Sequence, residues 1–383
     1  MTNLSDRSGK YALQPSGYKA FLPAPLPPDP PVEIDSEMQW LLSEADRALG
    51  RLDGSIQTLP NPELFVFMYV RKEAVLSSQI EGTQASINDL LRAEAKIFDS
   101  EAPNDVDEVL NYVAAMNYGL ARLGEIPLSI RLIKELHQQL LKSVRGRNLQ
   151  PGELRRSQNW IGPAGSTLST ATFIPPPYQE AEAALGELEK FLHASDELPP
   201  LIKIGLAHAQ FETIHPFLDG NGRIGRLLIT FFLCQQNILQ KPVLYLSHYF
   251  KQHRSEYYEK LQRTRVFGDW EGWLKFFLRG VADVGRQATD TAREIVDLRE
   301  KHRHIIMNEF GGTAANANKL LEYLYSHPTV SVNSVKEVLQ VSFPNANSLV
   351  EKFCNNQILF EITGQARNRV FSYSPYINLF ANL

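Results

Sequence analysis

The sequence predicts a mainly α-helical protein with one small β-hairpin in its middle and a winged helix-turn-helix at its C-terminal end. Apolar residues recur at helical spacing from residue 36 to about residue 307, which favours a helical core. Aromatic and β-branched residues gather in 159–174 around a Gly-Pro-Ala-Gly turn, as in a hairpin. After Gly311 and Gly312, three helical segments precede an alternating segment at 358–373. With 383 residues, the chain is long enough for at least two packed units.

The composition limits the partners and the compartment. The net charge of -4 gives no global positive field for nucleic acid or an anionic membrane, so any anion site must be local. Cys234 and Cys354 lie far apart in apolar segments, which indicates reduced, packed thiols. The N-terminus lacks an apolar signal core, and the longest strongly apolar stretch, 227–234, is too short to cross a bilayer. We therefore expect a cytoplasmic protein without a membrane partner.

An N-terminal proline-rich arm is expected at residues 1–35. Its stretch FLPAPLPPDPPVE, at 20–32, cannot sustain a helix and favours extended polyproline conformation. Such a segment either docks on the body as a packed lead-in or enters an aromatic groove of a partner protein. We expect the packed lead-in.

A helical core is expected at residues 36–308. Its first helix begins at Ser36, and Gly50 is expected to end it. A second helix is expected at 62–82, with Gly82 as its end. Further helices are predicted at residues 106–122, 129–144, 178–193, 200–213 and 270–307. Strand patterning in the core is confined to the hairpin.

A C-terminal domain is expected at residues 309–383, because three helices followed by a hairpin resemble a winged helix-turn-helix. Such a domain usually indicates DNA binding, but this one contains five Lys or Arg and five Glu residues, whereas phosphate neutralisation requires a surplus of positive charge. Protein interaction or dimerisation is therefore equally open. The candidate base or phosphate contacts are Asn345, Asn347, Ser348, Lys352 and Arg367.

The most informative segment is HPFLDGNGRIGR at residues 215–226, between the end of one predicted helix and the start of the next. Gly220 and Gly222 allow positive φ and let a ligand approach the backbone closely. Consecutive amides before a helix N-terminus form a cradle for an anion, and the helix dipole favours negative charge there. The segment therefore predicts a phosphate site.

Charged side chains of the same segment suit a nucleotide triphosphate. Arg223 and Arg226 lie three residues apart near the first helical turn, so both guanidinium groups can reach phosphates. Asp219 is a hard oxygen ligand that suits Mg²⁺ shared with ATP phosphates. His215 suits removal of a hydroxyl proton, because the ordinary imidazole pKa is close to neutrality. His208, two helical turns earlier, is expected to be a packed or hydrogen-bonded histidine.

The segment matches the HxFx(D/E)GNGRxxR signature and so resembles the Fic family of nucleotidyl transferases. The resemblance implies a Fic-type helical core, ATP and Mg²⁺, and AMP transfer to a Ser, Thr or Tyr hydroxyl of an unknown protein target, or of the protein itself. It also implies roles for single residues: His215 as general base, Phe217 as loop anchor, Asp219 as metal ligand, and Gly220, Asn221, Gly222, Arg223, Gly225 and Arg226 as ATP-binding residues. Homodimer formation is a further possibility that the sequence leaves open.

A second motif lies upstream, where Ser77 and Glu81 share one helix face and Gly82 follows them. This pattern resembles the inhibitory helix of Fic proteins. The carboxylate is expected to pair with Arg226 and to deny that arginine to the γ-phosphate of ATP. The same glutamate is also expected to help position a water for the removal of AMP, an alternative activity.

The hairpin at 159–174 resembles the family's flap, which pairs with the backbone of the target segment. The packing or target-facing positions are expected at Trp160, Ile161, Phe173 and Ile174. Two other functions stay open beside AMP transfer. A Fic-type phosphotransferase binds ATP in the inverted direction, which the retained Gly222 disfavours, and a winged-helix transcription regulator senses the nucleotide without chemistry.

Overall fold

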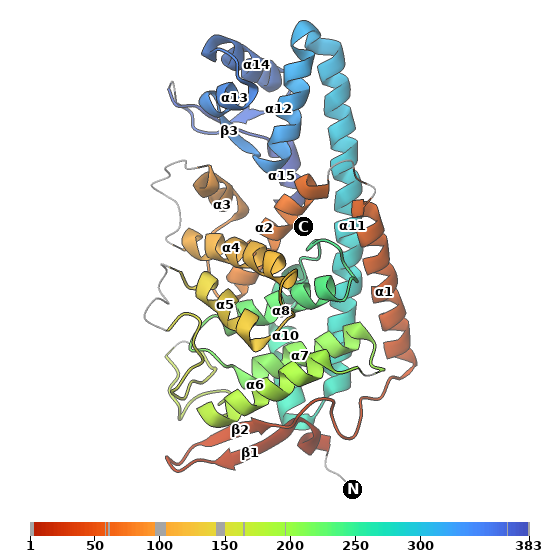
Figure 1. Cartoon of the computed structure of the whole chain (residues 1–383), viewed down its shortest axis with the longest axis vertical. Helices are drawn as coiled ribbons and strands as arrows, with labels where there is room; N and C mark the ends of the chain where they lie inside the picture. The colour runs from red at the N-terminus through yellow and green to blue at the C-terminus, as the bar shows by residue number, and fades with distance from the viewer. Residues whose placement is uncertain are drawn as a thin grey trace.

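Helices form most of this computed structural model, which describes residues 4–57, 59, 62–95, 105–142, 150–163, 165–195, 197–365 and 367–381. The molecule is elongated, with a C-terminal unit at one end of the long axis and an N-terminal hairpin at the other (Figure 1). Among the described ranges, no helix combines the length and the apolar character that crossing a bilayer requires.

The longest helix, α11 (Trp270–Glu309), runs along one side of the molecule from the core to the C-terminal unit (Figure 1). Its N-cap is Asp269, whose side chain accepts the Gly272 N–H at 3.0 Å. The first helix, α1 (Ser36–Gln57), packs lengthwise against it. The expectation that Gly50 ends α1 is wrong, because the helix continues through Gly50 to Gln57. An added Cβ at Gly50 would meet nothing within 4 Å, so no neighbouring atom requires a glycine at this position.

The remaining core helices include α7, whose residues from Leu201 to Ile214 are all buried. All faces of α7 are buried because α6, α8, α10, α11 and the N-terminal hairpin pack against it. The bounds of these helices are α2 (Pro62–Ile80), α3 (Ile87–Glu94), α4 (Val106–Leu123), α5 (Ile130–Leu140), α6 (Tyr178–His193), α7 (Pro200–Ile214), α8 (Asn221–Gln235), α9 (Ser247–Gln252) and α10 (Arg254–Phe267).

The α2 helix is buried along most of its length and ends close to the predicted position. The backbone leaves the helix at Gly82, where φ is +105°, and Thr83 donates its N–H to the Ser78 carbonyl at 3.3 Å. A glycine is required there because a side chain would strain this conformation. The turn places Glu81 at the very end of the helix.

The N-terminal arm folds into a two-stranded antiparallel hairpin, β1 (Gly9–Leu13) with β2 (Lys19–Pro23), which the sequence analysis did not predict. The Phe21 N–H donates to the Ile174 carbonyl at 2.9 Å, and Gln210 of α7 donates from Nε2 to the Ala24 carbonyl at 2.7 Å. The arm is therefore a packed lead-in, as expected, although it contains a 3-10 helix, η1 (Leu4–Ser8), and two strands.

The predicted flap hairpin at 159–174 is only partly correct. In its described residues, which exclude Ala164, one bridge joins Ile161 and Phe173 through two backbone hydrogen bonds of 2.8 and 3.0 Å. Prolines and glycines in the segment limit the ladder, because a proline has no N–H to donate. In its described residues, the flap is therefore a loop that is closed by one β-bridge, between Ile161 and Phe173.

The described residues of the C-terminal unit form four α-helices and a three-stranded antiparallel sheet in the order β3-β5-β4. The order of helices followed by paired strands agrees with the expectation, and β3 and α15 are additional. Tyr376 and Phe380 of α15 turn back toward the core, where the Phe380 ring lies 5.3 Å from that of Tyr69 in α2. The bounds are α12 (Ala314–Ser326), β3 (Thr329–Ser331), α13 (Val332–Leu339), α14 (Phe343–Asn355), β4 (Phe360–Glu361), β5 (Val370–Ser372) and α15 (Ser374–Ala381).

Gly119→Ala is expected to lower the free energy of unfolding by about 1–3 kcal/mol, because an overpacked core must shift. A Cβ at Gly119 of α4 would lie 2.3 Å from Cζ of Phe231 and 2.8 Å from Cδ2 of Leu136. Gly50→Ala is the matched control, since alanine favours an open helical site by about 0.5–1 kcal/mol. Chemical denaturation measures both, and equal effects of the two variants would contradict the packing described here.

Candidate active site

The motif predicted to bind phosphate forms the turn between α7 and α8. His215 ends α7 with a left-handed φ of +50°, and Gly220 precedes α8 with a φ of +76°. These two residues reverse the chain, so that the N-terminus of α8 and the His215 ring face the same region. The N–H groups of the first turn of α8 have no partners within the helix, as at any helix start.

Asn221 closes this turn from inside. Its Oδ1 accepts the Phe217 N–H and its Nδ2 donates to the Phe217 carbonyl, both at 2.8 Å, and the residue is only 2% exposed. The side chain is therefore committed to the loop. If Asn221 contacts phosphate as predicted, it must do so through its backbone N–H.

His137 of α5 supports the same turn and was missed by the sequence analysis. Its ring stacks on Phe217 with centroids 3.8 Å apart, and Phe217 itself is fully buried. Nδ1 accepts the Gly152 N–H at 2.9 Å, so Nε2 carries the proton and donates to the Asp219 carbonyl at 3.0 Å. Burial lowers the pKa of His137 to about 4, which keeps this donor and acceptor pattern at neutral pH.

Arg155 and Asn159 hold the turn from the flap side, and neither was predicted. Arg155 donates from Nε to the His215 carbonyl at 2.9 Å and from Nη2 to the Pro176 carbonyl at 2.5 Å. Asn159 donates from Nδ2 to the carbonyls of His215 and Phe217 at 3.2 and 2.9 Å. A buried arginine that serves backbone carbonyls leaves no pattern in the sequence, because its partners are distant in the chain.

The His215 imidazole is neutral at physiological pH. Burial lowers its pKa to about 3, and the positive charges of Arg265 and Arg155 lower it further in the same direction. Its Nδ1 is buried without a hydrogen-bond partner among the residues that the structure describes. A neutral ring of this kind can accept a proton, and a bound polyphosphate would raise its pKa through opposite charge.

Arg226 is the most firmly held cation of the motif. It is 3% exposed, and it donates from Nε to the Ser77 Oγ at 2.8 Å and from Nη2 to the Ser77 carbonyl at 2.9 Å. Nη2 also donates to Glu81 Oε1 at 2.7 Å, which is the predicted ion pair. Burial raises the pKa of the Glu81 carboxyl, but Arg226 outweighs it and holds the pKa below its ordinary value.

Arg223 and Asp219 lie at the same helix start. Arg223 is 4% exposed, with Nη1 3.3 Å from Glu108 Oε2 and Nη2 3.4 Å from Asp219 Oδ2. Asp219 is more open, at 46% side-chain exposure, and its Oδ1 accepts the Gly220 N–H at 2.7 Å. The Arg223 contacts are long and its Nε is unpartnered within the described part of the chain, so it retains donors for an anion.

Two glycines of α8 permit close approaches on one helix face. A Cβ at Gly222 would lie 2.3 Å from Glu81 Oε1 and 3.0 Å from Arg226 Nη1. A Cβ at Gly225 would lie 2.5 Å from Glu212 Oε1. Neighbouring carboxylates therefore leave no room for a side chain at either position, even without a bound ligand.

A cavity of about 600 Å³ lies between part of this site and the flap, and its lining does not include Asp219 or Arg223. His215, Gly222, Arg226 and Glu81 lie on its wall, and α10 supplies a wall that the sequence analysis did not predict. From the flap, Trp160, Ile161 and Phe173 line the cavity, whereas Ile174 instead pairs with the N-terminal hairpin. The residues of α10 on the wall are Arg254, Tyr257, Tyr258, Leu261, Gln262 and Arg265.

His208 ties three helices together behind the cavity, as expected for a packed histidine. Nδ1 lies 2.9 Å from the Gly225 carbonyl and Nε2 lies 2.9 Å from the Tyr257 hydroxyl. The ring therefore donates from Nδ1 and accepts at Nε2. Burial lowers the pKa of His208 to about 3, so the ring stays neutral.

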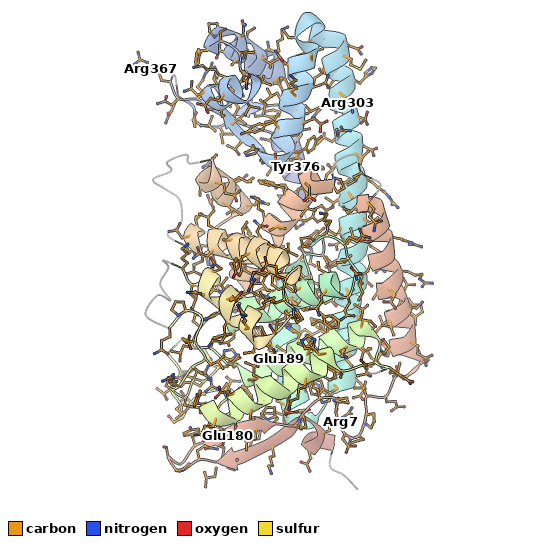
Figure 2. The ribbon with its side chains drawn as sticks, viewed as in Figure 1. Arg7, Glu180, Glu189, Arg303, Arg367 and Tyr376 are labelled. Atoms are coloured by element: carbon orange, nitrogen blue, oxygen red, sulfur yellow. The ribbon has the colours of Figure 1, made fainter. Side chains whose placement is uncertain are left out.

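The candidate DNA contacts of the C-terminal unit lie far from this cavity, and two of them are engaged elsewhere. Lys352 donates to Thr313 Oγ1 at 3.2 Å, and Asn347 lies between Glu351 and Arg369, at 2.7 and 3.0 Å. Arg367 extends from the outer tip of the unit (Figure 2). Asn345 and Ser348 are exposed on α14.

His208→Gln is expected to reduce the loss of stability in acid. The folded-state pKa lies below the ordinary value, so the unfolded chain binds the proton preferentially and the free energy of unfolding falls as pH drops below about 6.5. One such group contributes a slope of about 1.4 kcal/mol per pH unit. Denaturation between pH 7 and 5 measures the slope, and His304→Gln, an exposed histidine of α11, is the control. A slope equal to that of the unmodified protein would contradict this account.

Two family descriptions match the chain. The Fic/DOC family N-terminal domain matches residues 39–121, and the Fic/DOC family domain matches residues 127–233. The protein adenylyltransferases Fic of Drosophila melanogaster and Drosophila yakuba are 31% and 30% identical to it over 217 residues. The aligned region is 55% of this chain but only 39% of each relative, so the chain spans about two-fifths of their length.

Solved structures share the fold. A Fic family protein from Desulfovibrio desulfuricans superposes with a TM-score of 0.60 at 18% identity, over 89% of this chain and 97% of that one. A Fic domain containing signaling protein from Bacteroides thetaiotaomicron gives a TM-score of 0.51 at 20% identity, over 67% and 97%. With both domain matches, the helical architecture and the intact motif of residues 215–226, this chain belongs to the Fic/DOC family.

Proposed function

We propose that the chain transfers AMP from ATP to a Ser, Thr or Tyr hydroxyl of a protein, and that Glu81 inhibits this activity. The observation that carries the proposal is the single cavity into which a neutral His215, the α8 N-terminus and Arg226 converge beneath the flap. The curated relatives named protein adenylyltransferase support the same reaction class.

The reaction follows from these positions. The target hydroxyl oxygen attacks the α-phosphorus of ATP while the His215 imidazole accepts its proton. The bond from the α-phosphorus to the bridging oxygen breaks, and pyrophosphate leaves with the electron pair. The first amides of α8, with Arg223 and Arg226, balance the negative charge that develops on the phosphates.

Asp219 is the residue that would hold Mg²⁺. Its carboxylate is half-exposed beside the phosphate cradle, and Mg²⁺ in nucleotide sites commonly takes one or two carboxylates together with phosphate oxygens. Across the residues that the structure describes, no group of three or more His, Cys, Asp or Glu side chains forms a metal site. When bound, the ion neutralises charge on the phosphates.

Gly222 favours AMP transfer over phosphate transfer. Glu81 Oε1 and Arg226 Nη1 lie 2.3 and 3.0 Å from the point where a Cβ of residue 222 would be. The bare backbone would therefore let phosphate oxygens reach the α8 amides once Glu81 has moved away. A side chain here would displace the triphosphate from that position and favour the inverted binding direction.

The proposed inhibition is a competition for one cation. Glu81 occupies Nη2 of Arg226, and Ser77 occupies Nε and shares Nη2, so this guanidinium has few donors left for a γ-phosphate. Glu81 is 35% exposed, so it can leave the cavity more readily than the buried arginine can. ATP in the inhibited protein would bind with its triphosphate displaced.

His215→Ala is expected to lower AMP transfer by about 10²- to 10⁴-fold, the usual contribution of a general base. The measurement uses purified protein with ATP labelled at the α-phosphate and a parallel reaction labelled at the γ-phosphate. Protein label from the α-phosphate alone identifies AMP transfer, whereas label from the γ-phosphate alone would replace the proposal with phosphate transfer. His304→Ala is the control and should retain the parent rate.

Glu81→Gly is expected to raise AMP transfer by about ten- to a hundredfold, because a hydrogen bond between charged groups contributes about 1.5–3 kcal/mol. Label from the α-phosphate, on the protein itself or in a lysate, measures the rate. Glu63→Gly, in the first turn of the same helix, is the matched control for loss of a carboxylate. Unchanged or lower labelling by the Glu81 variant would remove the inhibitory role.

A further inference from the structure

Pro216, the second residue of the motif, removes one backbone donor from the end of α7. In a continuing helix the carbonyl of Glu212 would accept the N–H four residues later, but a proline has no N–H. Arg265 of α10 supplies the missing donor, because its Nη2 donates to this carbonyl at 3.0 Å. Its Nε donates to Thr213 Oγ1 at 3.1 Å. Two nitrogen atoms of one guanidinium therefore hold the last turn of α7.

The same guanidinium contacts the flap. Arg265 is 6% exposed, and its Cζ lies 4.0 Å from the centre of the Phe173 ring. Phe173 is buried, and the Phe21 ring of the N-terminal hairpin packs against it with centroids 5.8 Å apart. A guanidinium over an aromatic face is attracted through its charge and packs through its flat surface. Arg265 therefore connects the flap, backed by the N-terminal hairpin, to the end of α7.

The turn that Arg265 holds carries the His215 ring. His215 is the next residue after α7, and its left-handed φ of +50° is where the chain leaves the helix. Burial is the main cause of the low pKa of His215, the charge of Arg265 lowers that pKa further, and the Glu212 carbonyl acts in the opposite direction. The carbonyl that Arg265 holds thus also acts on the imidazole. A shift of this turn would therefore move the ring.

Arg265 differs in this respect from the arginines of the motif. Its Nε and Nη2 are directed to α7, and its Nη1 lies 3.5 Å from Gln262 Oε1. Each of its three nitrogen atoms thus faces an acceptor of the protein. In the described part of the chain, Arg223 instead has a buried Nε without a partner. This pattern indicates that Arg265 joins parts of the protein to one another and does not serve as a phosphate ligand.

We propose that Arg265 is a positioning residue for the nucleotidyl transfer proposed above, and that it fixes His215 relative to the flap. In that reaction the flap holds the target segment, and His215 accepts the proton of the target hydroxyl. The two must therefore be correctly placed relative to each other, because proton transfer requires hydrogen-bond distance. Arg265 acts through the end of α7 and through Phe173, and it transfers no proton itself.

The test replaces Arg265 by lysine in the Glu81→Gly protein. Lysine keeps the positive charge but lacks the planar fork, so it cannot hold the α7 turn and cover the Phe173 ring together. The labelling rate from ATP labelled at the α-phosphate, on the protein itself and in a lysate, is measured against ATP concentration. We expect the maximal rate to fall at least about tenfold while KM for ATP stays within about threefold, because only the placement of reacting groups changes.

Two further variants break the same link at its ends. Thr213→Val removes only the acceptor of Nε, and it serves as the test if Arg265→Lys does not fold. It should lower the maximal rate about threefold or more with KM for ATP unchanged, since one hydrogen bond to a charged group is lost. Phe173→Leu removes the ring of the flap. Combined with Arg265→Lys, it should add less than about threefold to the loss, because both changes interrupt one connection.

Arg263→Lys is the matched control on the same helix. Arg263 also lies over an aromatic ring, at 5.5 Å from the centre of Phe267, and it pairs with Asp269 at 2.7 Å. It does not line the cavity. The control should keep the maximal rate and KM of the Glu81→Gly protein.

The outcomes separate this inference from the proposed function. Equal rates for Arg265→Lys and Arg263→Lys overturn the positioning role, and so does a double variant whose loss equals the product of the single losses. A rise in KM for ATP that accounts for the whole loss makes Arg265 a nucleotide ligand and also overturns the role. Absence of α-phosphate label with the Glu81→Gly protein, on itself and in the lysate, overturns the nucleotidyl transfer instead.

Discussion

The structure depends on how one buried guanidinium is neutralised. Arg226 lies in the first turns of α8 at 3% exposure, where a cation without an anion would be very costly. Ser77 and Glu81 satisfy it from α2, although they are 149 and 145 residues away in the chain. This contact joins the N-terminal part of the core to the motif of residues 215–226. It also engages the Nε and Nη2 donors of the arginine.

The Arg226–Glu81 contact links the fold to the proposed reaction. In the function that we propose, a triphosphate would bring the negative charge that Arg226 otherwise takes from Glu81, so nucleotide binding would compete with the Glu81 contact for the same donors. Further along α2, Tyr69 donates its hydroxyl to the Ala288 carbonyl of α11 at 2.7 Å and contacts Phe380 of the C-terminal unit. One buried helix therefore contacts the cavity at one end and the C-terminal unit at the other.

The second constraint is the rigidity of the turn after α7. Asn221 closes it from within, His137 stacks on Phe217, and Arg155 with Asn159 binds its carbonyls. Each of these side chains satisfies backbone groups that would otherwise be buried and unpaired. The geometry of His215 and of the α8 N-terminus is thus set before any ligand binds, which is the preorganisation that electrostatic catalysis requires.

The sequence by itself determined the helical class, the positions of most helices and the motif from His215 to Arg226, because periodicity and glycine placement act over a few residues. It also predicted the pairing of Glu81 with Arg226, through the family resemblance. The end of α1, the strands of the arm and the extent of pairing in the flap were predicted less well. A glycine is tolerated inside a helix, and such short strand pairs depend on contacts with the rest of the core. Only the tertiary structure revealed His137, Arg155 and Asn159, because their roles arise from burial beside segments that are distant in the chain.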